Sequence, residues 1–63
     1  MAADEREPST TQRQGRARQL ERAADRCDEL ADIADLMGDD ATALELRAQA
    51  NRNRMAALHL LDR

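Results

Sequence analysis

Few residues in this sequence are of a type that could carry out chemistry, and His59 is the first to consider. It is the only histidine, and Asp62 follows three residues later, on the same face if the segment is helical. A histidine–carboxylate pair can orient a general base or help to hold a metal ion. An imidazolium near the end of a helix also interacts favourably with the helix dipole, which is a purely structural role. The paired Glu-x-x-His motifs of di-metal helical bundles do not occur, so we predict a non-enzymatic protein with no metal or cofactor.

Cys27 is the only cysteine, so a disulfide within the chain is excluded, whereas a bridge between two chains is not. It falls in the middle of an apolar stripe, where a free cysteine behaves as a small hydrophobic side chain. The acidic neighbours Asp25 and Asp28 disfavour a thiolate, and we therefore interpret Cys27 as structural. A redox or intersubunit role is the alternative.

The charged residues offer two further candidate sites. Four acids at helical spacing form one face, which we interpret as solvated because it lacks the loop that calcium sites use; they are Asp28, Glu29, Asp32 and Asp35. All ten basic residues are arginines, and a candidate basic patch consists of Arg13, Arg16, Arg52 and Arg54. Clustered arginines can bind nucleic-acid phosphates. The chain has a net charge of −3 and no aromatic side chain to stack on bases, so a nucleic-acid-associated regulator is the alternative function.

Two helices must position these groups, because apolar residues recur at alternating steps of three and four. The first helix carries the row Leu20, Ala23, Cys27, Leu30, Ala34 and Met37. The second carries the row Leu44, Ala48, Asn51, Met55 and Leu58, beside an adjacent row of Ala43, Leu46, Ala50, Ala57 and Leu61. We predict that the first row of each helix forms a self-association seam. Asn51 either fixes the register of this seam or lies at an exposed edge.

The stretch Met37-Gly38-Asp39-Asp40 is the only strong break between the helices. Gly38 is suited to the left-handed conformation that closes a helix, and Asp39 or Asp40 can cap the next one. The sequence therefore predicts a helix at about 10–37, a turn at 38–40 and a helix at about 41–61, after a disordered tail at 1–8. Gly15 costs about 1 kcal/mol relative to alanine in a helix, so we expect the firm part of the first helix to begin near Arg16. So short a turn makes the helices antiparallel neighbours, and the fold of residues 9–63 is an all-α hairpin.

The region around the turn resembles one tetratricopeptide repeat. That motif has a small residue in its first helix, a Gly-Asp turn and two small residues seven apart in its second helix. The corresponding residues here are Leu30, Ala31, Gly38, Asp39, Ala43 and Ala50. The resemblance covers residues 25–53, without the aromatic residues, the following proline or a second copy of the motif. It implies a protein-interaction unit.

The size of the chain and its charge layout predict self-association. A chain of 63 residues with no aromatic side chain can bury only a small core, and such chains usually need a staple, a metal or a partner. Seven acids and no base lie within residues 27–46, whereas arginines outnumber acids in residues 12–26 and 47–63. A second hairpin laid antiparallel would set the acidic turn against the basic open end. We therefore predict a homodimer, a four-helix bundle of two hairpins.

The predicted function is that of a small protein-interaction or assembly module, which can also dock on a larger protein. No apolar run reaches the roughly 20 residues that a membrane-spanning helix needs, so we expect no membrane insertion. No basic region followed by an apolar stretch begins the sequence, and the expected location is cytoplasmic.

Overall fold

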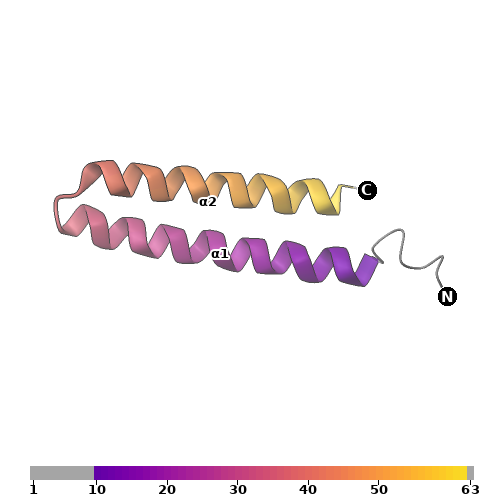
Figure 1. The fold of residues 1–63 in the computed structure, drawn as a ribbon. Helices are drawn as coiled ribbons and strands as arrows, with labels where there is room; N and C mark the ends of the chain where they lie inside the picture. The colour runs from indigo at the N-terminus through magenta and orange to yellow at the C-terminus, as the bar shows by residue number, and fades with distance from the viewer. Residues whose placement is uncertain (1–9, 63) are drawn as a thin grey trace.

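The computed structural model describes residues 10–62, which form two helices joined by a tight turn (Figure 1). Helix α1 is Thr10–Leu36 and helix α2 is Asp40–Leu61. They lie side by side and run in opposite directions, with their free ends together and the turn at the far end (Figure 1). This confirms the predicted all-α, two-helix hairpin. The tail predicted at 1–8 lies outside the described residues.

The first helix starts earlier than its glycine suggests. It is continuous from Thr10 through Gly15, instead of becoming firm near Arg16. We attribute this continuity to packing beside α2, since Leu60 and Leu61 of α2 border a small pocket together with Thr10, Arg13 and Gln14. Contacts with α2 thus offset the low helix propensity of Gly15.

The turn is built from one glycine and one aspartate, each used at a helix end. Gly38 has φ of +81°, the left-handed conformation that closes a helix. Its N–H donates to the carbonyl oxygen of Asp35 at 3.0 Å, and the Asp39 N–H donates to that of Ala34 at 2.8 Å. These two bonds are the pair that defines a Schellman motif.

Asp39 then begins α2 as its N-cap. Its side chain accepts a hydrogen bond from the Thr42 N–H at 3.2 Å, and its carbonyl oxygen accepts the first helical bond, from Ala43, at 3.1 Å. Hydrogen bonding by the Thr42 side chain, and to a smaller extent by its backbone N–H, lowers the pKa of Asp39 because it stabilises the carboxylate. Asp39 thus takes part both in the bonds that close α1 and in the cap that begins α2. For this reason the connection needs only three residues, 37–39.

The two helices meet along rows of alanine. In the part of the chain that the structure describes, alanine is the only residue type that is buried, at Ala17, Ala24, Ala31, Ala34, Ala43, Ala50 and Ala57. Ala31 and Ala43 belong to one cluster, and both rows then repeat every seven residues. The register therefore places Ala24 opposite Ala50 and Ala17 opposite Ala57. This is an antiparallel coiled coil in which methyl groups on both sides allow a close approach of the backbones.

Larger side chains flank the alanine rows and are only half-buried. They lie three residues after the alanines, at Leu20, Cys27, Leu46, Asn53 and Leu60. None fills a central core as leucine does in a wider coiled coil. The inside of the hairpin is therefore narrow, and its large apolar residues lie elsewhere.

Candidate interaction surface

The residues that could carry out chemistry do not form a centre. Asp62 contacts His59 only through the backbone, as the C-cap residue whose N–H donates to the His59 carbonyl oxygen at 3.4 Å. His59 is exposed in the last turn of α2, and Cys27 is half-buried with a free thiol. Among residues 10–62, no group of three or more His, Cys, Asp or Glu side chains is arranged to hold a metal ion.

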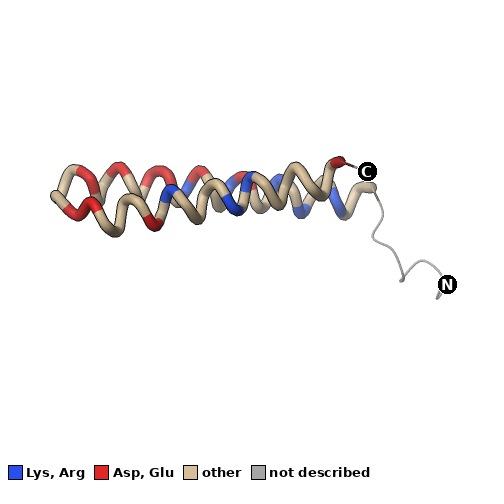
Figure 2. The backbone as a smooth tube through the Cα atoms, turned by 90° about the horizontal axis from the view of Figure 1, so that it is seen from above, with Lys and Arg blue, Asp and Glu red and all other residues tan. Residues whose placement is uncertain are grey.

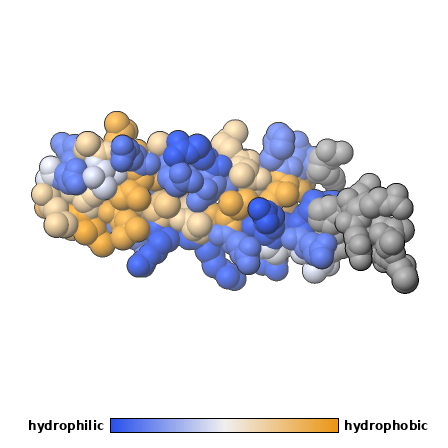
Figure 3. Space-filling view, in the orientation of Figure 1, coloured by the Kyte–Doolittle hydropathy of each residue, from blue (hydrophilic) through white to orange (hydrophobic). Residues whose placement is uncertain are grey.

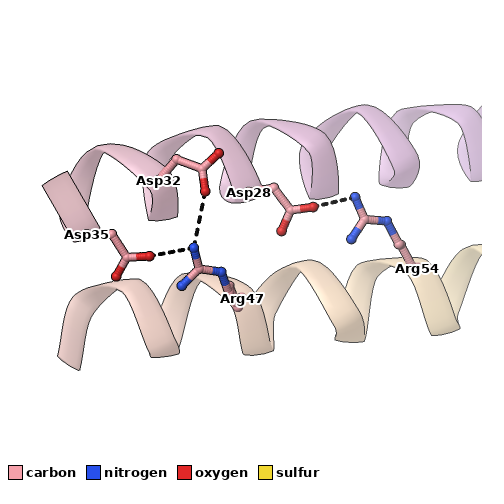
Figure 4. Close-up of polar contacts among 5 residues, drawn as sticks. All are labelled: Asp28, Asp32, Asp35, Arg47 and Arg54. Carbon is pink, nitrogen blue, oxygen red and sulfur yellow. Dashed lines mark hydrogen bonds and ion pairs between the residues drawn. The ribbon is translucent and has the colours of Figure 1, made fainter. Parts of the chain in front are cut away.

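The acidic face is bridged to the opposite helix by two arginines (Figure 4). The Arg47 Nη2 group donates to Asp35 Oδ2 at 2.7 Å and to Asp32 Oδ1 at 3.1 Å. Seven residues along each helix the arrangement recurs, with Arg54 Nη2 donating to Asp28 at 2.7 Å and Asp25 at 3.0 Å. The face is solvated, as interpreted, because its side chains are at least 43% exposed, and three of its members, Asp28, Asp32 and Asp35, are in addition linked to α2 by these arginines. Glu29 pairs instead within α1, with Arg26 at 3.7 Å.

These forked ion pairs fix how the helices sit against one another. The hydrogen bond to Asp35, with further help from Asp32, raises the pKa of Arg47, and bonds to Asp28 and Asp25 do the same for Arg54. All of these side chains are at least 40% exposed, so screening by water keeps each pair weak. Their contribution is to orientation, because a shift of one helix along the other would break both forks at once.

The predicted basic patch is divided by the fold. Arg13 and Arg16 border one open groove at the free end of the hairpin, together with Gln19 and Leu60. Arg54 is held by its aspartates on the bridged face, and Arg52 donates to Gln49 at 2.7 Å. Residues two apart on a helix point in different directions, so Arg52 and Arg54 cannot act together on one partner strand. What remains is a gradient along the axis, acidic at the turn and basic towards the free ends (Figure 2).

The large apolar side chains lie mostly on the outside. Eight are exposed, namely Leu30, Ile33, Leu36, Met37, Leu44, Met55, Leu58 and Leu61. Figure 3 shows such side chains reaching the surface over α1 near the turn and again towards the free end. A monomer that buries alanine and exposes leucine and methionine has its apolar residues arranged for contact with another molecule.

The structure divides the predicted self-association seam between several places. In α1, Ala34 is buried, Leu20 and Cys27 are half-buried between the helices, and Ala23, Leu30 and Met37 are exposed along one flank. In α2, the row that packs against α1 is the adjacent one, with Ala43, Ala50 and Ala57. The predicted row instead forms what we call the outer stripe, Leu44, Ala48, Asn51, Met55 and Leu58.

The outer stripe faces away from α1 along most of α2. Its residues lie about 100° and 140° around the helix from the alanine row, because they follow each alanine by one or five positions. Leu44, Met55 and Leu58 are 71%, 65% and 59% exposed, Asn51 is exposed and Ala48 is half-buried. The role of this stripe in self-association stays a prediction.

A second apolar feature is an open groove between the helices near their free ends. It has a volume of about 560 Å³ and is lined by Arg16, Leu20, Met55, Ala56, His59 and Leu60. The groove is shallow and open along one face. It could receive an apolar side chain of a partner, but it has no convergent set of polar groups to orient a small substrate.

Comparison with known proteins found no matching family model, no matching curated protein and no matching solved structure. In the part of the chain that the structure describes, neither helix combines the length and the apolar character needed to cross a membrane. The residues behind the tetratricopeptide-like pattern include Ala31, Ala43 and Ala50, which are the close-packing positions of this hairpin. A closely packed coiled coil also requires small residues at these places, and the tetratricopeptide-like resemblance stays a prediction.

Proposed function

We propose that this protein is a small interaction or assembly module without enzymatic activity, and that it self-associates through its exposed apolar side chains. The observation that supports this proposal best is the distribution of apolar side chains, in which the small ones are buried and the large ones are exposed. The buried positions of the described chain are all alanine, whereas eight leucine, isoleucine and methionine side chains are exposed.

The energetics of burial support a partner. Burying a Leu, Ile or Met side chain contributes about 1.5–3 kcal/mol, whereas each CH₂-sized group contributes about 0.8 kcal/mol. Ordering the backbone costs about 1–2 kcal/mol per residue. The alanine rows therefore stabilise a single hairpin only slightly, and a second interface that covers leucine and methionine would add substantially to the stability.

The charge layout supports an antiparallel homodimer, a four-helix bundle of two hairpins. The turn half of the molecule is acidic and the free-end half is basic (Figure 2). Antiparallel copies place opposite charges against each other, whereas parallel copies would place the seven acids of residues 27–46 beside the same seven acids. The nucleic-acid alternative has less support, because two of the four arginines of the predicted basic patch already have partners in the chain: Arg54 is paired with Asp25 and Asp28, and Arg52 donates to Gln49.

Light scattering coupled to size exclusion tests the proposal, because it measures mass independently of the elongated shape. We expect twice the mass of one chain at micromolar concentration, and dissociation on dilution accompanied by loss of helicity. A monomer with full helicity at about 100 µM would refute self-association, since an interface too weak to form there has a free energy of less than about 5.5 kcal/mol.

A further inference from the structure

We propose that the outer stripe of α2 is the site at which a second copy of the chain docks, with the two α2 helices antiparallel and their Asn51 side chains facing each other at the twofold axis. This inference rests on the proposed self-association and specifies its surface and register.

The outer stripe holds three of the eight exposed large apolar side chains, Leu44, Met55 and Leu58, in one row along α2. It extends from Leu44 to Leu58, and its only polar member is Asn51. The competing row on the flank of α1 also contains Ala23, Leu30 and Met37, but Arg16 and Arg26 interrupt it. The groove at the free end is bordered by Arg16 and His59. The row from Leu44 to Leu58 is about four turns long and contains no charged member, although Arg52 flanks it next to Asn51.

The spacing of the stripe is self-complementary about Asn51. Leu44 lies seven residues before Asn51 and Leu58 lies seven residues after it. In an antiparallel pair centred there, Leu44 meets Leu58 of the partner subunit, and Ala48 comes within one residue, a rise of about 1.5 Å, of the level of Met55 of the partner subunit. Large side chains thus pair at the ends, and a small one faces a flexible one nearer the centre, which is the arrangement that closely packed helices require.

Asn51 gives this pairing a defined register. Its side chain makes no hydrogen bond within residues 10–62, and it is exposed in the single chain. A carboxamide offers both a donor and an acceptor, so two of them across a twofold axis satisfy each other. A shift of either helix would place Asn51 against Ala48 or Met55 and leave its polar atoms unpaired, which is the cost that fixes the register in other helical seams.

The charges beside the stripe favour the antiparallel direction. Glu45 comes close to His59 of the partner subunit, which can donate a hydrogen bond to it. Each chain is acidic at the turn and basic towards its free ends (Figure 2), so antiparallel copies would set the acidic turn of one beside the basic free end of the other. Arg52 of each copy lies near the axis and opposes association, whereas Arg47 and Arg54 are already paired with aspartates of their own chain. The charges at the ends of the hairpins therefore favour the antiparallel direction of the two α2 helices, and Asn51 at the centre fixes their register.

Disulfide trapping tests this arrangement. The variant Asn51→Cys, in a Cys27→Ser background, carries a single cysteine at the proposed axis. We expect mild oxidation with copper–phenanthroline to convert most of it to a covalent dimer. The control Ala23→Cys, in the same background, has an equally exposed cysteine at the middle of α1 and should remain monomeric on a non-reducing gel.

A second experiment measures the association itself. Leu58→Asp should weaken dimerisation at least tenfold by sedimentation equilibrium while circular dichroism shows helices at saturating concentration. Leu36→Asp, which makes the same change at a residue 87% exposed and away from the stripe, should leave the dimerisation constant within twofold of the unsubstituted chain. Trapping at Ala23 but not at Asn51, or equal effects of the two aspartates, would overturn the proposed surface while leaving self-association standing. A monomeric parent chain would instead refute the proposed function.

Discussion

Replacing Gly38 with alanine tests the turn on which the hairpin depends. Gly38 has φ of +81°, where a residue with a Cβ atom is less stable by about 1–2 kcal/mol. A Cβ atom placed there would meet nothing within 4 Å, so steric overlap adds nothing to this cost. For a domain of this size, 1 kcal/mol corresponds to about 4–8 °C in Tm, and we expect Gly38→Ala to lower Tm by roughly 5–15 °C.

Gly15→Ala is the matched control, because the chemical change is identical and the expected sign is opposite. Gly15 lies within α1, and a Cβ atom there also meets nothing within 4 Å. Alanine should stabilise this helical position by about 1 kcal/mol. Both variants are followed by ellipticity at 222 nm during heating, at one fixed protein concentration because self-association shifts Tm. Equal or parallel shifts in the two variants would refute the role assigned to the left-handed turn.

Two further predictions concern charge. Arg54→Ala should lower the urea midpoint at low salt, because it removes the ion pairs with Asp25 and Asp28. This loss should largely disappear at about 1 M NaCl, where exposed ion pairs are screened. Arg18→Ala makes the same charge change without these contacts, and an equal loss in that variant would contradict the role assigned to Arg54. The hydrogen bond from Thr42 holds the folded-state pKa of Asp39 below its ordinary value of 3.8, so its contribution to stability is complete above that pH and is lost as the pH falls through the lower folded value. Asp39→Asn keeps a capping oxygen that does not titrate, so its urea midpoint should fall less than that of the parent chain between about pH 5 and pH 2; identical pH profiles would show that Asp39 is not the group responsible.

The helices and the turn could be predicted because their signals are local. Gly38 and Asp39 act within a few residues of themselves, and the steps of three and four that mark a helix do not depend on its partner. The start of α1 at Thr10 agrees with the predicted bound of about 10, but the continuity of the helix through Gly15 could not be predicted in this way. Gly15 weakens the helix locally, but Leu60 and Leu61 of α2 compensate, and the sequence alone does not show that they lie beside it.

The packing row of α2 was ambiguous for a different reason. Ala43, Ala50 and Ala57 repeat every seven residues, and so do Leu44, Asn51 and Leu58 one position later. Hydrophobicity favours the leucine row, whereas close approach of two backbones favours the alanine row, and the observed fold follows the second. A clue was present in α1, where Ala17, Ala24 and Ala31 have the same spacing.

The arginine forks depended on the register between the helices. Helical side chains lean towards the N-terminus of their own helix, so Arg47 reaches towards the turn, where it meets Asp32 and Asp35. The aspartates that Arg47 meets are therefore determined by two factors, the length of the turn and the direction in which the arginine side chain points. The repeat of seven between Arg47 and Arg54, matched by Asp28 and Asp35, was the sequence signal for this face.

The alanine rows have a consequence for the number of chains in the folded unit. The same contacts would form if α1 of one copy packed against α2 of another, which is a domain-swapped pair. Only the three-residue turn, with its left-handed Gly38 and the bonds to Ala34 and Asp35, favours closure within one chain. A change that straightened this turn would keep every buried alanine buried and join α1 and α2 into one long rod. The turn therefore determines whether the alanine rows pair within a chain or between chains, while the secondary structure hardly changes.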